Sequence, residues 1–146
     1  MSIPDPHRDP QFYQGVPLRR FVAFWIDTIA ILLLWFVGAV LLAAVTLGLA
    51  TPLFPVLFVG TAFAYRWLLL SRISATLGMQ LTGIEVRDNQ GERMTPTVAA
   101  LHTIGFMVTL TFLPLAILGW ILMANSPTRQ ALHDSIFGTV VINRPD

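Results

Sequence analysis

The sequence predicts an all-α membrane protein, built from a two-helix transmembrane hairpin and a third apolar segment that a proline interrupts. Hydrophobic residues make up 55% of its 146 residues and charged residues only 12%, whereas soluble domains carry roughly a quarter charged residues. Long apolar stretches alternate with short charged segments. We therefore expect a lipid bilayer to be the solvent for much of this chain, and the length leaves room for one domain.

Composition also excludes several classes of function. The chain has no cysteine, which removes disulfides, thiolate metal sites and cysteine nucleophiles. Its net charge is +1 and its longest basic run is Arg19-Arg20, so the basic surface of a nucleic-acid-binding protein is missing. No serine has the flanking glycines of a hydrolase nucleophile turn. We expect no enzymatic activity, no cofactor and no nucleic-acid partner.

Residues 1–17 are expected to form a disordered tail in front of a single membrane domain over residues 18–146. Four of the ten prolines lie in this tail, together with several charges and no apolar periodicity. Such a composition is typical of a solvated segment that has no core of its own.

Two apolar segments are each long enough to cross a hydrocarbon core of roughly 30 Å. The first span is expected over about residues 21–45 and contains one charged residue, Asp27. The second is expected over about residues 52–71 and contains Arg66 alone. Pro52 at its start is tolerated, because the first N–H groups of a helix have no helical partners. A short turn joins the two spans into an antiparallel hairpin.

The third apolar segment is expected over about residues 98–123, within a stretch free of Asp, Glu, Lys and Arg. Pro114 lies near its middle, where proline removes a backbone hydrogen bond and clashes with the preceding turn. Two arrangements stay open. The segment is either a kinked helix that crosses fully or a re-entrant pair of half-helices.

Short β-structure is expected at the membrane surface. Residues 83–87 alternate apolar and polar side chains, and residues 88–91 are rich in turn formers. Residues 92–95 are then able to form a returning strand. This order predicts a short cytoplasmic β-hairpin, with an irregular loop as the alternative. A strand-like segment, Thr139–Asn143, follows near the C-terminus.

Arginine placement predicts the orientation, since the chain contains no lysine. Arginines precede the first span and follow the second, and none lies in the turn between them. This bias predicts that the N-terminus and residues 71–96 lie in the cytoplasm. The membrane is then expected to be the inner membrane. A full third crossing would put Arg129 and Arg144 outside, whereas a re-entrant segment would keep them inside.

Asp27 and Arg66 are the first candidate functional residues, because a charge at the centre of a bilayer costs at least ~2.5–3.5 kcal/mol. Asp27 lies about 9 Å and Arg66 about 7.5 Å from the cytoplasmic ends of their helices, at ~1.5 Å per residue. The matched depth predicts a direct ion pair. Arg20 lies on the same helical face as Asp27 and is a second partner, while Thr28 offers an oxygen ligand.

A second polar group lies near the C-terminus. Gln130, His133 and Asp134 share one face of a short helix near the membrane surface. His102 is a single histidine on an apolar segment, which favours a hydrogen-bonded residue between helices. Because no second histidine follows at ligand spacing, we predict no metal site.

Three ordered motifs cover the chain from about Pro17 to Asn143. They are Arg20-x-x-Ala23-x-x-x-Asp27, then Thr76-Leu77-Gly78-x-x-Leu81-x-Gly83-Ile84-x-Val86-x-Asp88-x-x-Gly91, and finally Gln130-x-Leu132-His133-Asp134 followed by Gly138-Thr139-Val140-Val141. Together they resemble the RDD family of bacterial membrane proteins, named for one arginine and two aspartates. The resemblance implies that Arg20, Asp27 and Asp134 belong together. It also implies that the C-terminal strand pairs with residues 83–87, which requires a cytoplasmic C-terminal tail.

Two functions from different classes follow. In the first, the chain handles ions or small solutes, with Asp27 as the ion-binding group, Arg20 and Arg66 as its partners and Asp134 as a cytoplasmic gate. A proton or a monovalent cation is then the expected ion, and a homo-oligomer is expected because two or three helices enclose little volume. In the second, the protein is a structural or assembly factor for a larger membrane partner, and its ion pair only holds helices together.

Overall fold

The computed structural model describes residues 2–145 and is mostly helical. In chain order the elements are η1 (Pro10–Phe12), α1 (Val16–Thr46), η2 (Thr51–Leu53), α2 (Phe54–Ile73), α3 (Leu77–Thr82), β1 (Ile84–Arg87), α4 (Pro96–Thr111), α5 (Leu113–Asn125), α6 (Leu132–Phe137) and β2 (Val140–Asn143). Helices α1 and α2 are each long and apolar enough to cross a membrane, and a third crossing is available if α4 and α5 form one bent span.

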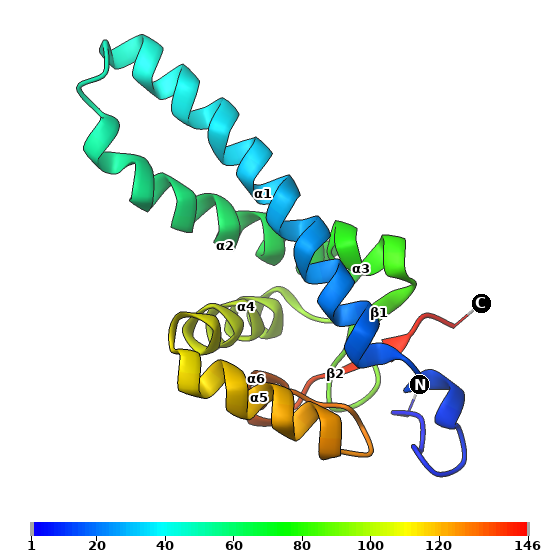
Figure 1. Cartoon of the computed structure of the whole chain (residues 1–146). Coiled ribbons are helices and arrows are strands. Elements are labelled where there is room, and N and C mark those ends of the chain that lie inside the picture. Colours follow the sequence, from blue (N-terminus) through cyan, green and yellow to red (C-terminus); the bar gives the residue numbers. More distant parts are fainter. Residues whose placement is uncertain (1, 146) are drawn as a thin grey trace.

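Helices α1 and α2 form the predicted hairpin, which projects from the rest of the chain with its turn at the far end (Figure 1). Trp35 Nε1 donates to the carbonyl oxygen of Phe54 at 3.0 Å and joins the helices near that turn. Only 11% of the most apolar stretch of each helix is buried within the chain. The outward faces are therefore apolar and need lipid or another apolar partner around them.

The third apolar segment is broken, as the position of Pro114 predicts. Helices α4 and α5 meet at 114°, and the backbone between them is extended at Phe112. Pro114 occupies the first turn of α5, where its missing N–H costs no helical hydrogen bond. The break precedes the proline because, in a continuous helix, Pro114 would lack an N–H to donate and its ring would clash with the carbonyl four residues earlier. A single straight helix over residues 98–123 is not present.

The two strands lie far apart in the sequence but pair with each other, in the arrangement that the family resemblance implies. Strands β1 and β2 are antiparallel, with Val86 opposite Val141. The predicted β-hairpin over residues 83–95 is wrong, because its return segment makes only one bridge, between Arg87 and Arg93. Ser74 occupies that side instead: its carbonyl accepts from the Val86 N–H at 2.7 Å.

The N-terminal segment also differs from the prediction, since its described part is packed rather than disordered. Tyr13 is only 4% exposed, and its hydroxyl donates to the carbonyl oxygen of Pro4 at 2.7 Å. Asn143 Nδ2, at the end of β2, donates to the carbonyl oxygens of Gln11 and Gln14 at 2.7 and 2.9 Å. These long-range contacts hold a segment whose composition alone indicates a solvated tail.

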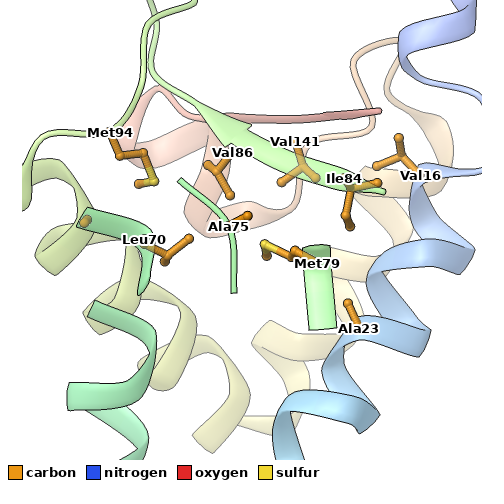
Figure 2. Packing of buried hydrophobic residues seen from close by; sticks show 10 residues of the cluster. Val16, Ala23, Leu70, Ala75, Met79, Ile84, Val86, Met94 and Val141 are labelled. Atoms are coloured by element: carbon orange, nitrogen blue, oxygen red, sulfur yellow. The ribbon is translucent and has the colours of Figure 1, made fainter. Parts of the chain in front are cut away.

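The main apolar core lies at the base of the hairpin, between the sheet and the helices that surround it (Figure 2). Its buried members are Val16, Ala23, Leu70, Ala75, Met79, Ile84, Val86, Met94, Ala99 and Val141. Their side chains come from both membrane helices, from α3 and α4, and from both strands. The core therefore fixes the ends of α1 and α2 relative to α3, α4 and the two strands.

Gly78 permits the closest approach between two of these elements. A Cβ atom built on Gly78 would lie 2.2 Å from the carbonyl oxygen of Ala23. Helix α3 therefore rests directly on the backbone of α1, and no larger residue fits without moving one of them.

We expect Gly78→Ala to lower the free energy of unfolding by about 1–3 kcal/mol, because overpacking forces backbone shifts. Helical circular dichroism of the purified protein during denaturation in detergent measures this change. Gly60→Ala is the matched control, since no described atom lies within 4 Å of a Cβ at Gly60 and alanine favours the helix. Equal stability of the two variants would contradict the close packing of α3 on α1.

Candidate functional site

Asp27 lies in α1 near the base of the hairpin and is almost fully buried, with 1% exposure. Its carboxylate accepts three hydrogen bonds: from Tyr65 Oη at 2.8 Å, from Thr76 Oγ1 at 2.6 Å and from the Gly78 N–H at 2.8 Å. These donors come from α2 and from the start of α3. Asp27 therefore connects three elements, and its oxygens have partners that offset the cost of burial.

Arg66 is the charged neighbour of Asp27, but it is not hydrogen-bonded to it. Its Nη1 lies 3.8 Å from Asp27 Oδ2, so the two charges are close enough to compensate each other. The guanidinium carbon lies 4.2 Å from the centre of the Phe106 ring, a cation–π contact with α4. Within residues 2–145, the Arg66 guanidinium donates no hydrogen bond to another protein group.

A second Arg–Asp pair lies closer to the C-terminus of the chain. Arg20 Nη1 donates to Asp134 Oδ2, and Arg20 Nη2 lies 3.4 Å from His133 Nε2. Asp134 is completely buried, and the same Oδ2 accepts the Ala131 N–H at 3.0 Å. Arg20 thus binds the aspartate of α6, and its predicted partner Asp27 is held by other groups.

His102 and His133 lie beside the Arg20–Asp134 pair. Their ring centres are 4.8 Å apart, and His102 Nδ1 lies 3.0 Å from Thr139 Oγ1. Asp134 Oδ1 faces both rings, at 3.5 Å from His102 Nδ1 and 3.3 Å from His133 Nε2. Nδ1 of His133 is enclosed and has no partner among the described residues.

Electrostatics at α6 keep an aspartate charged and a histidine neutral. Burial raises the pKa of Asp134, but the charge and hydrogen bond of Arg20 together with the two neighbouring histidines outweigh burial and hold that pKa below its ordinary value. Burial lowers the pKa of His133 to about 4, against the attraction of Asp134 and with the help of repulsion from Arg20 and Arg66. At neutral pH the imidazole of His133 is therefore uncharged beside an ionised carboxylate.

The fold brings together three side chains that have the chemistry of metal ligands. Ligand atoms of His102, His133 and Asp134 all lie within 4.8 Å of one another. The second histidine comes from a distant helix, so the ligand spacing used in the sequence prediction does not detect it. Arg20 opposes a cation here, because its guanidinium holds Asp134 and approaches His133 Nε2. Asp134 and His133 are better described as partners of Arg20.

Two cavities lie beside these pairs. The smaller, about 40 Å³, is lined by ionisable side chains from four helices, including Arg20, Asp27, Arg66, His102 and His133. The larger, about 220 Å³, lies among α1, α4, α5 and α6 and has mostly apolar walls. Arg20 and His133 line both cavities. The two predicted charge groups thus meet around one small polar space.

The two remaining predicted residues are placed differently. Thr28 Oγ1 donates to the carbonyl of Phe24 within its own helix at 2.7 Å, and among the described residues it makes no hydrogen bond to Asp27. Gln130 Nε2 donates to the Thr139 carbonyl at 2.8 Å and so supports the residue that contacts His102.

Sequence reasoning missed four of the contacts around Asp27 and Asp134. Tyr65, Thr76 and Gly78 donate to Asp27, and Thr139 Oγ1 lies 3.3 Å from Asp134 Oδ1. Thr76, Gly78 and Thr139 stand inside the motifs quoted above, which was the available signal. Tyr65 carried none, because an aromatic residue near a helix end equally indicates the membrane interface.

This fold and site define a small helical membrane protein with two buried Arg–Asp pairs at the base of its spans. The sequence profile of the RDD family matches residues 15–138, a range that includes Arg20, Asp27 and Asp134. The chain belongs to the RDD family. No curated protein and no solved structure matches it.

We expect the stability of the protein to fall as the pH is lowered from about 6.5 to about 4. In this window the unfolded chain protonates His133, whose ordinary pKa is 6.5, while the folded chain does not, because its pKa is about 4. The loss from this residue is up to about 3 kcal/mol. Unfolding at several pH values should therefore show a smaller loss for His133→Gln than for the unchanged protein.

His7→Gln provides the control, because His7 is exposed and its loss should leave the pH profile unchanged. A profile for His133→Gln that matches the unchanged protein would show that this imidazole is not held neutral by the fold.

Proposed function

We propose that this membrane protein lies in the bacterial inner membrane and handles a small ion at the polar cavity between its two Arg–Asp pairs. The observation that carries the proposal is the cavity of about 40 Å³ that Arg20, Asp27, Arg66 and two histidines line. Ionisable groups at membrane depth are costly and commonly mark ion pathways. A proton or a monovalent cation is the ion that the sequence pattern predicts first.

The proposed topology has two full crossings, α1 and α2, with the N-terminus in the cytoplasm. Pairing of β1 with β2 supports a cytoplasmic C-terminus, because only the short helix α3 separates β1 from the second crossing. The bend of 114° between α4 and α5 supports a re-entrant pair that enters and leaves on the cytoplasmic side. Arginine placement around the first two spans supports the same orientation.

We further propose that the protein acts as a homo-oligomer. Two crossing helices enclose no protected path by themselves, and most of their apolar surface faces outward. Neighbouring copies would surround the hairpins and complete a route to the cavity from the far side of the membrane.

Ion flux into liposomes tests the proposal. We expect Asp27→Asn to reduce the flux of protons or sodium at least about tenfold, which corresponds to a barrier increase of about 1.4 kcal/mol. Glu92→Gln removes an exposed carboxylate and should leave the flux unchanged. Unaltered flux through a folded Asp27→Asn protein would end the assignment of Asp27 to ion handling.

A structural role is the second candidate, and the three hydrogen bonds to Asp27 favour it. Donors from α2 and α3 saturate both carboxylate oxygens, as expected of a residue that joins helices. In this case the protein would assemble with a larger membrane partner, and the polar cavity would have no transport role.

The two tyrosines of the chain offer a matched measurement of this role. Tyr65→Phe removes a donor to the Asp27 carboxylate and should lower the free energy of unfolding by about 1.5–3 kcal/mol. Tyr13→Phe removes a donor to the neutral Pro4 carbonyl and should cost only about 0.5–1.5 kcal/mol. Denaturation in detergent compares them. If Tyr65→Phe costs no more than Tyr13→Phe, the anchoring role of Asp27 is weak.

A further inference from the structure

The polar cavity contains one cationic group whose hydrogen-bonding capacity is unused. Arg66 is 6% exposed, and its planar guanidinium carries five N–H donors. Its two close contacts are Asp27 Oδ2 at 3.8 Å and the face of Phe106. Neither contact is a hydrogen bond to a protein oxygen. Buried polar groups are usually paired, so these donors require an acceptor from outside the chain.

Arg66 is one of the residues that line the small cavity. In residues 2–145, the polar side-chain atoms that are both enclosed and unpaired lie elsewhere, at His133 Nδ1 and Asn143 Oδ1. The Arg66 nitrogens therefore keep accessible surface, and Arg66 lines the cavity of about 40 Å³. One water needs roughly 10–15 Å³, so the space takes about three waters or a single small ion.

The charge facing this space is positive. Asp27 lines the cavity, but both of its oxygens already accept hydrogen bonds. The Asp134 carboxylate is held by Arg20. Arg20 also lines the cavity, and only its Nη1 is bonded to Asp134. The groups with donors left are therefore guanidiniums, which bind anions more strongly than neutral donors do.

We propose that this cavity is a binding site for a small monovalent anion with the chemistry of a halide, held by the guanidinium of Arg66 and faced by Arg20. Its volume excludes large organic anions, and the Phe24 and Phe106 side chains on its wall limit access of water. The inference rests on the proposed ion-handling function for the role of the cavity and goes beyond it, because it adds an anion to the proton or cation proposed above; binding is measured without any flux.

Thermal unfolding in detergent tests the site with chloride and bromide as probes. Gluconate, which is too large for the cavity, is replaced by either halide at constant sodium concentration. A ligand that binds only the folded state raises the unfolding midpoint in a saturable manner, and we expect a rise of about 2–5 °C. Absence of any halide-dependent rise in the unchanged protein would overturn the proposal.

Arg66→Gln should weaken the apparent halide affinity at least about tenfold, because a hydrogen bond to a charged group is lost. Arg72→Gln is the matched control, since Arg72 lies on the same helix and is exposed. It should respond to halide like the unchanged protein. An equal response in Arg66→Gln would place halide binding elsewhere and reject the site.

A second measurement needs no variant. Bromide in crystals of the unchanged protein should give an anomalous scattering peak within hydrogen-bond distance of the Arg66 guanidinium, whereas ordered water alone in the cavity would reject the anion. Halide binding without ion flux would reject transport and keep the site. Flux that depends on Asp27 without halide binding would support transport and reject the anion site.

Discussion

A buried carboxylate in α1 imposes the central constraint on this fold. Moving an ionised Asp27 out of water is costly unless several donors reach it, and no single helix neighbour supplies them. The chain satisfies it with Tyr65 from α2 and with Thr76 and Gly78 at the start of α3. Because all of these donors must reach Asp27, this residue determines where α2 and α3 lie. It also determines how closely α3 approaches Ala23.

A second buried carboxylate, that of Asp134, imposes the same kind of constraint between α1 and α6. Arg20 holds Asp134, and burial of His133 lowers its pKa and keeps it neutral beside this carboxylate. Helix α1 therefore contributes one residue to each charge pair, and the two pairs connect it to α2 and to α6. Neither pair fills the space beside it, so ionisable side chains from both pairs line the small cavity that remains.

Sequence patterns predicted the features that depend on local composition. Both membrane helices, the break near Pro114 and the closeness of Asp27 to Arg66 follow from apolar length, proline chemistry and depth along a helix. The donors to Asp27 and the meeting of His102 with His133 depend on packing between distant segments, which no local pattern contains. The hairpin over residues 83–95 failed because strand alternation cannot identify the partner strand.

The distance along the chain between Arg20 and Asp134 has a consequence for biosynthesis. They are separated by 114 positions, whereas the donors to Asp27 follow it within about half that distance. During translation, chains emerge from the N-terminus onward. The membrane hairpin is therefore able to assemble around Asp27 early, while Arg20 waits for a partner that is synthesised much later. The Arg20–Asp134 pair therefore closes the base of the hairpin only after the hairpin itself has been made.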